Sequence, residues 1–328
     1  MDLFTHVLLA YLLTYGLVGP NPSYLAAGAL AGGLPDADIL FFPIARRFPI
    51  LRHHGITHSI FGVTVVALVG AVVAPMLAPG SPLIYFVVME AGGLAHVLGD
   101  GFTHFSVPPL LPFSNAPLEL DADRAINFLT LGVSVASFYL LIGVERNHVP
   151  FAVYSLTVYA LMAFYGAYIA IRLAGRFFIT RHRGALAPNA VPIPTGNPFS
   201  WLLLAEERSP EKVRTTWAKY QLGRGLVAGP FSVEASPSAP PHPGETPRSA
   251  AEALDWSYPL ARRASRMMED TYHFGEAFER DGGDWEAIWY SLEFTSFGRA
   301  MAVRVRFPHL GGEPVVKTAF YKPQGVRV

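Results

Sequence analysis

The stretch PLIYFVVMEAGGLAHVLGDGFTH, residues 82–104, combines a long apolar run with three side chains near its end that can bind metal. A hydrocarbon core of about 30 Å takes about 20 apolar residues to cross, so this run is long enough. Its last turns carry His96, Asp100 and His104 at four-residue spacing. A helix presents such residues along one stripe that drifts by about 40° per step. The stretch therefore predicts a membrane helix with metal-capable side chains at one end.

Five further segments have the same apolar character, and we predict an all-α polytopic membrane domain of about six transmembrane helices. The six segments are approximately 3–19, 23–44, 57–78, 82–104, 126–144 and 150–173. Short Gly/Pro loops join them, for example at 19–22 and 79–82, which makes a large soluble core of buried helices the weaker alternative. The first segment opens with Asp2 and has no basic region before it, so we expect it to be retained and not cleaved as a signal peptide.

The composition changes after about residue 178, where the long apolar runs stop. All lysines and tryptophans of the chain lie beyond this point. We predict a membrane domain over 1–178, a basic and proline-rich connector over 179–200, and a small soluble α+β domain over 201–328. For this last domain the patterns predict strands within 201–220, 287–297, 300–307 and 315–321, a helix within 258–280, and a mobile loop over 229–247.

The distribution of arginine predicts the orientation in the membrane. One side collects Arg46, Arg47, Arg52, Arg124, Arg172, Arg176, Arg181 and Arg183, and the other side has Arg146. By the positive-inside rule, both termini and the soluble domain are cytoplasmic in a multi-pass protein of the cell membrane.

Charge and cysteine content narrow the possible functions. The formal net charge is zero, which gives no electrostatic footprint for nucleic acid. The chain has no cysteine, which excludes disulfides, iron–sulfur clusters and thiolate zinc sites. Any bound metal must therefore be held by histidine and carboxylate.

Metal-capable side chains recur at the same ends of the first four apolar segments. They are Asp2, His6, Asp36, Asp38, His54, His58, His96, Asp100 and His104. If consecutive segments cross the membrane in alternating directions, these ends meet on one side. Each motif alone has a simpler explanation, such as a charge at a helix start, solvated acids or a polar stripe. Their convergence favours a metal site, from which Glu90 is excluded because it lies about 15 Å deeper along its helix.

The order and spacing of these motifs resemble the YdjM-like family of membrane-bound metal-dependent hydrolases. The resemblance covers about residues 1–180 and rests on Asp2-x-x-Thr5-His6, Pro35-Asp36-x-Asp38, His54-Gly55-Ile56-Thr57-His58-Ser59, and His96-x-x-x-Asp100-x-x-Thr103-His104 followed by Pro108-x-x-x-Pro112-Phe113-Ser114. It implies a metal-dependent hydrolase. The family is distantly similar to zinc-dependent phospholipases C and related nucleases in ligand type and helical setting.

We therefore predict a metal-dependent hydrolase with its site at the cytoplasmic membrane interface. One or two divalent ions, zinc or alternatively manganese, would be held by the nine residues, with Asp100 able to bridge two ions. Asp36 or Asp38 is the expected general base, and the substrate is an ester or phosphoester, with membrane lipid a candidate. One alternative is a transport or metal-permeation protein, in which intramembrane acids and histidines mark an ion path. Another is a b-type haem protein, which the aspartates disfavour.

Overall fold

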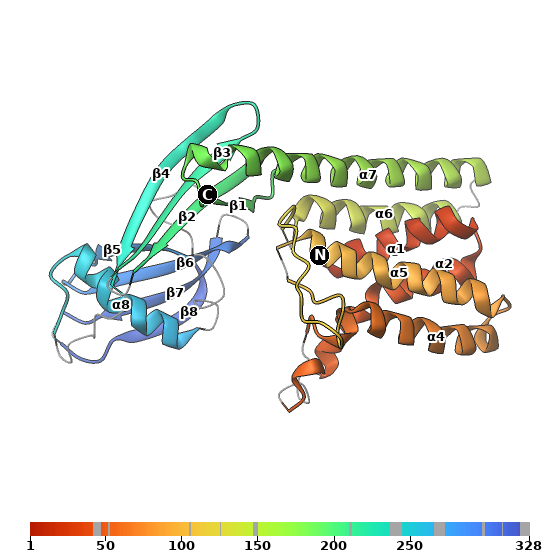
Figure 1. Ribbon diagram of the computed structural model, residues 1–328, viewed down its shortest axis with the longest axis horizontal. Coiled ribbons are helices and arrows are strands. Elements are labelled where there is room, and N and C mark those ends of the chain that lie inside the picture. The colour runs from red at the N-terminus through yellow and green to blue at the C-terminus, as the bar shows by residue number, and fades with distance from the viewer. Residues whose placement is uncertain are drawn as a thin grey trace. The chain divides into compact units, whose positions relative to one another are not determined.

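A computed structural model gives the structure of the chain in two compact units (Figure 1). One comprises Met1–Phe177 with Pro194–Phe199, and the other comprises Phe178–Ile193 with Ser200–Val328. The structure describes residues 1–41, 47–51, 53–104, 106–124, 126–146, 150–209, 212–236, 245–265, 273–296, 299–309 and 311–321.

The first unit is helical, and helix α5 lies at its centre. Its elements are α1 (Leu3–Val18), α2 (Pro22–Gly33), three short 3-10 helices η1 (Pro35–Phe41), η2 (Pro49–Leu51) and η3 (Ile56–His58), then α4 (Ile60–Leu77), α5 (Pro82–Phe102), α6 (Phe128–Arg146) and the start of α7 (Phe151–His182). Helix α5 packs against α1, α2 and α4 (Figure 1). The helix that carries His96 and Asp100 is therefore surrounded by α1, which carries His6, and by α2 and α4, between which the chain carries Asp36 and His58.

Glycines let α2 pack closely against both α5 and α1. A Cβ at Gly92 would collide with the carbonyl oxygen of Gly28, and a Cβ at Gly32 would collide with Ala10 of α1. Small residues at such crossings are typical of helices packed in membranes, where close van der Waals contact is the main attraction. This approach places the end of α2 beside the last turns of α5, where His96 and Asp100 lie.

The structure supports fewer spanning helices than the six predicted. Among the described residues, three helices are long and apolar enough to cross a membrane, Ile60–Leu77, Pro82–Phe102 and Phe151–Ala185, while Leu3–Val18 and Phe128–Val144 are apolar but shorter. The sequence predicts one helix over 23–44, but α2 has only 12 residues and the 3-10 helix η1 follows it, while residues 42–44 lie outside the described residues. The paired glycines at the end of α2 and Pro35 account for this break, since glycine weakens a helix and proline cannot continue one.

The outer face of α4 consists of exposed apolar side chains. Val65, Val69, Val72, Met76 and Leu77 are all exposed, although α4 has the highest hydropathy of the candidate spans. A soluble protein rarely exposes so continuous an apolar face, whereas lipid accommodates it. The burial pattern therefore agrees with the membrane assignment for this helix.

The second unit contains two four-stranded antiparallel sheets with strand orders β1-β2-β3-β4 and β5-β6-β7-β8. The strands are β1 (Val191–Pro194), β2 (Ser200–Arg208), β3 (Val213–Gln221), β4 (Gly225–Ala235), β5 (His273–Glu279), β6 (Trp285–Ser296), β7 (Arg299–Phe307) and β8 (Val315–Tyr321). The strands predicted within 201–220, 287–297, 300–307 and 315–321 are confirmed. In β7 the apolar positions Val303, Val305 and Phe307 are fully buried, as their alternation with arginine predicts.

Two predictions for this unit were wrong in position. The helix is α8 (Ala250–Ala264), and His273–Glu279, which the helical spacing had included, pairs with β6 as β5. Pairing with a neighbouring strand outweighs local periodicity here. The predicted mobile loop over 229–247 begins inside β4, and residues 237–244 of it lie outside the described part of the chain. Helix α8 buries Trp256 and Ala261 in a core with Trp289 and Phe307.

Candidate metal centre

Asp36, His58, His96 and Asp100 form one cluster inside the helical unit. One donor atom from each of the four lies within 4.8 Å of all the others. Asp36 comes from η1, His58 from η3, and the other two from successive turns of α5. The side chains of His58, His96 and Asp100 are buried, and that of Asp36 is 22% exposed. Three chain segments thus bring two imidazoles and two carboxylates to one point.

The donor atoms are spaced as a single ion requires. Asp100 Oδ2 lies 3.2 Å from His96 Nε2 and 3.4 Å from His58 Nε2. Asp36 Oδ1 lies 3.6 Å from each of the same two nitrogens. A tetrahedral zinc ion with bonds of about 2.0–2.1 Å has neighbouring ligand atoms about 3.3 Å apart. The four donors therefore fit one tetrahedral ion with small adjustments.

Three of these donor atoms are buried without a hydrogen-bond partner in the structure: His58 Nε2, His96 Nε2 and Asp100 Oδ2. A buried polar atom with no partner costs about 1–3 kcal/mol, more if it is charged. All three atoms face the same point, so one cation between them would satisfy all of them. This cluster can accordingly hold a metal ion.

Gly32 and His6 contact those atoms of His96 and Asp100 that face away from the cluster, and these contacts orient the two side chains. His96 Nδ1 lies 2.7 Å from the carbonyl oxygen of Gly32. Because a carbonyl can only accept, the ring donates from Nδ1 and its Nε2 keeps a free lone pair, as metal-binding histidines require. His6 Nε2 lies 3.0 Å from the second oxygen of Asp100, and the His6 ring stacks on His96 with centroids 3.7 Å apart. His6 therefore contacts the side of Asp100 that faces away from His58.

Asp38 lies on the far side of His58. Its buried carboxylate contacts His53 Nδ1 at 2.7 Å, accepts a hydrogen bond from Thr57 Oγ1 at 2.8 Å, and lies 3.3 Å from His58 Nδ1. Burial raises the pKa of Asp38, but its contacts with His53, His58 and Thr57 outweigh this and hold the pKa well below its ordinary value. A carboxylate behind a histidine in this way fixes the ring and increases its basicity toward a metal.

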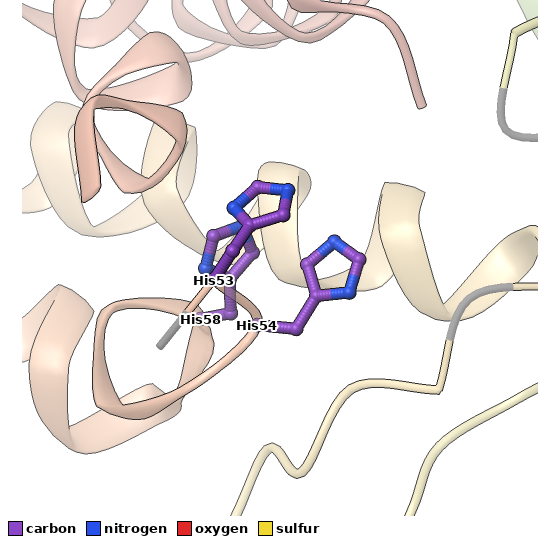
Figure 2. A group of neighbouring side chains, drawn as sticks. All are labelled: His53, His54 and His58. Atoms are coloured by element: carbon purple, nitrogen blue, oxygen red, sulfur yellow. The ribbon is translucent and has the colours of Figure 1, made fainter. Parts of the chain in front are cut away.

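A second group consists of His53, His54 and His58, which come from one short segment (Figure 2). His54 adopts a left-handed backbone with φ 62°, which few residues other than glycine do, and its Nε2 lies 3.8 Å from Asp100 Oδ2. Burial, opposed by Asp100, lowers the pKa of His54 to about 3, so its imidazole is neutral. His54 thus lies at the edge of the four-residue cluster, and His53 is half exposed.

Asp2 and His104 lie outside the four-residue cluster. Asp2 caps helix α1, where its carboxylate accepts hydrogen bonds from Thr5 N at 2.9 Å and Thr5 Oγ1 at 2.7 Å. Helix α5 ends at Phe102 and Thr103 is extended, so His104 does not continue the stripe of His96 and Asp100. Burial and the charge of Arg124 lower the pKa of His104 to about 4.

The sequence did not reveal two of the orienting contacts. The carbonyl of Gly32 carries no side-chain signal, although the paired glycines there mark the close approach of α2 to α5. The role of Thr57 could have been inferred from its place next to His58, since a hydroxyl beside a ligand often binds a nearby carboxylate.

Comparison with known proteins places these residues within one family. The family described as YdjM inner membrane protein matches residues 1–178, which include the whole cluster. Comparison with curated proteins and with solved structures gave no match.

Proposed function

The chain belongs to the family of YdjM inner membrane proteins, and from this membership and the four-residue cluster we propose that it is a membrane metal-dependent hydrolase acting on an ester or phosphoester. The observation that carries the proposal is a set of three buried donors without a hydrogen-bond partner, His58 Nε2, His96 Nε2 and Asp100 Oδ2, in which the carboxylate oxygen lies 3.4 and 3.2 Å from the two nitrogens. Two imidazoles with carboxylate are the donor set of catalytic zinc sites, and zinc is our first choice over manganese.

We assign His58, His96 and Asp100 as the ligands, because each is buried and the opposite side of each is held by another group. A divalent ion held by these three residues would lower the pKa of a water and polarise the oxygen of the scissile group. Of the wider set predicted from the sequence, His6 and Asp38 would orient these ligands. His54, at 3.8 Å from Asp100, stands where it could join a second ion, so a two-ion site stays a prediction.

Asp36 is the general base in this proposal, since it is the one carboxylate of the cluster that reaches solvent. Its carboxylate takes a proton from the attacking water while the water oxygen bonds to the carbonyl carbon or phosphorus. The bond to the leaving alcohol oxygen then breaks, and Asp36 returns the proton to that oxygen. Asp38, the other candidate base, has both oxygens engaged by His53, Thr57 and His58 and is therefore less suited to this role.

Metal content and hydrolysis measured together test the proposal. The full chain, purified in detergent and loaded with zinc or manganese, is assayed by elemental analysis and with bis(p-nitrophenyl) phosphate, p-nitrophenyl phosphate and p-nitrophenyl butyrate. We expect Asp100→Asn to lose metal and activity. Asp36→Asn should keep the metal and lose activity by about 10²–10⁴-fold, the usual contribution of a general base. A wild-type protein that binds no metal, or that hydrolyses no substrate better than Asp36→Asn, would overturn the proposal.

The alternative of a transport protein predicts polar groups along the depth of the membrane. Helix α4 carries no charged residue, and Glu90 is the one charged residue of α5 besides Asp100. Glu90 accepts a hydrogen bond from Thr64 at 2.9 Å. A single acid that is hydrogen-bonded to a threonine does not form an ion path through the membrane, and the His/Asp cluster lies at the helix ends. We therefore favour the hydrolase.

A further inference from the structure

A cavity of about 90 Å³ lies between α2, α4 and α5 in the helical unit. Its walls include Leu34 and Pro35 at the end of α2, Val63 and Val66 of α4, and Met89 of α5. Thr57 also contributes to the wall, and its hydroxyl is already used in a hydrogen bond to Asp38. The rest of the lining consists of apolar side chains and glycines, so the cavity suits hydrocarbon and offers nothing to a polar ligand.

The cavity and the metal centre are built from the same segments. Pro35 of the cavity wall directly precedes Asp36, and Thr57 directly precedes His58. Gly93 of the wall lies about one helical turn before His96. A molecule whose scissile bond lies at the metal centre therefore has its adjoining atoms within reach of an apolar cavity.

The cavity borders the exposed apolar side of α4. Val66 lines it and is 39% exposed, and Val65 and Val69 next to it are exposed as well. The volume is smaller than the 150 Å³ of a cavity that binds benzene, so it has room for only a few carbon atoms. Any longer chain must leave past Val66 and run along the apolar face of α4.

From this arrangement we propose that the cavity holds the first carbons of a hydrocarbon chain of a membrane lipid whose ester or phosphoester is hydrolysed at the metal centre. The inference rests on the proposed function, because it names the substrate class of the same site. The chain enters from the bilayer along α4, while the polar head stays at the end of the helices where Asp36 reaches solvent.

Binding is tested without hydrolysis by photolabelling. The full chain is reconstituted with phosphatidylglycerol that carries a diazirine near the carbonyl end of one acyl chain, and labelled residues are mapped by mass spectrometry. Val66→Trp fills the cavity at Val66, Val66→Leu fills it less, and Val153→Trp is the matched control, since Val153 is exposed on α7 and does not line the cavity. We expect labelling of residues 56–66 to fall in the order Val153→Trp, Val66→Leu, Val66→Trp. Equal labelling in all three variants would mean ordinary boundary lipid and would overturn the inference.

Hydrolysis provides the second arm. Ethyl and octyl p-nitrophenyl phosphate are compared with zinc-loaded protein in the same micelles. Octyl ester should give at least about a tenfold higher kcat/KM, because each buried methylene contributes a factor of about four. Val66→Trp should remove this preference and keep the metal content, while Val153→Trp keeps both. Labelling that depends on Val66 without hydrolysis of any ester would overturn the proposed function and leave a lipid-binding cavity. Hydrolysis with no chain-length preference would overturn the cavity inference alone.

Discussion

His96 donates its Nδ1–H to the carbonyl of Gly32 across 2.7 Å, and this bond fixes which nitrogen of the ring is offered to a metal. Gly32 lies in the last turn of α2, and the packing of α2 against α5 brings its carbonyl to that position. The bond joins residues 64 positions apart in the chain. The tautomer of His96 is therefore decided by helix packing.

Two substitutions of His96 distinguish its role as a metal ligand from its hydrogen bond to the Gly32 carbonyl. His96→Asn keeps an amide donor near the position of Nδ1 and removes the nitrogen that faces Asp100. We expect loss of bound metal with a small change in thermal stability, whereas His96→Ala should also lower stability, since it leaves the Gly32 carbonyl without its donor. Elemental analysis and thermal size-exclusion chromatography measure the two effects. If His96→Asn kept its full metal content, His96 would be excluded as a metal ligand.

Asp2→Ala tests whether Asp2 caps α1 or binds metal. The variant removes the acceptor for Thr5 N and Thr5 Oγ1, and loss of such a cap costs about 1 kcal/mol. We expect a lower melting temperature and an unchanged metal-to-protein ratio. Asp2→Asn, which can still cap, serves as the control and should restore most of the stability. Loss of metal in both variants would instead make Asp2 a ligand.

Metal binding should release a proton from His58. Burial lowers the pKa of His58, but the carboxylates of Asp36, Asp38 and Asp100 outweigh this and raise it to about 9 in the absence of metal. A ligand imidazole must be neutral, so the ion displaces this proton at neutral pH, and affinity should increase with pH until about pH 9. Without metal the raised pKa stabilises the fold below about pH 6.5, and that contribution is lost as the pH rises through about 9.

Calorimetry in buffers of different ionisation enthalpy measures this proton release. The enthalpy of zinc binding to the wild type should differ between PIPES and HEPES by the difference between the ionisation enthalpies of these buffers, which corresponds to about one proton released per ion. Asp38→Asn removes one of the carboxylates that raise the pKa of His58 and should reduce the proton release. Identical enthalpies in both buffers would contradict the raised pKa.

The orientation predicted from arginine can be tested because the chain has no cysteine of its own. Ser106→Cys marks the end of α5 near the metal centre, and Ser81→Cys marks the opposite end. In spheroplasts, a membrane-impermeant maleimide should label Ser81→Cys directly and Ser106→Cys only after permeabilisation. The reverse pattern would place the metal centre on the outer side.

Arg172 and Asp123 form a buried ion pair that holds the segment after α5. Arg172 Nη2 lies 2.9 Å from Asp123 Oδ1, both side chains are buried, and Tyr168 donates to the other oxygen at 2.6 Å. Arg172→Leu leaves a buried carboxylate without its cation, which costs about 3–5 kcal/mol. We expect a large fall in the melting temperature of the detergent-solubilised protein. The double variant Arg172→Leu/Asp123→Leu should recover much of the loss, and equal melting of single variant and wild type would contradict a structural role.

Features that depend on residues close to one another in the sequence could be predicted. The pairing of His96 with Asp100 follows from helical spacing, and the burial of Val303, Val305 and Phe307 follows from alternation in a strand. The number of spanning helices could not be predicted as well, because the apolar run over 23–44 hides the break after Gly33. Helix–strand confusion at His273–Glu279 has a related cause, since a short segment takes the conformation that its partner strand imposes.

By itself the sequence determined the family, the membrane character of the first 178 residues and the end of the helices where metal-capable side chains gather, because apolar length and residue spacing are local properties. The tertiary structure alone decided which of the nine candidate residues form the cluster, which support it and which lie outside it. It brings Asp36, His58, His96 and Asp100 within 4.8 Å of one another, places Asp38 behind His58, and uses Asp2 as a helix cap. Ligand distances must agree to a few tenths of an ångström. That agreement comes from the packing of α2 and the 3-10 helices against α5, which no local pattern encodes.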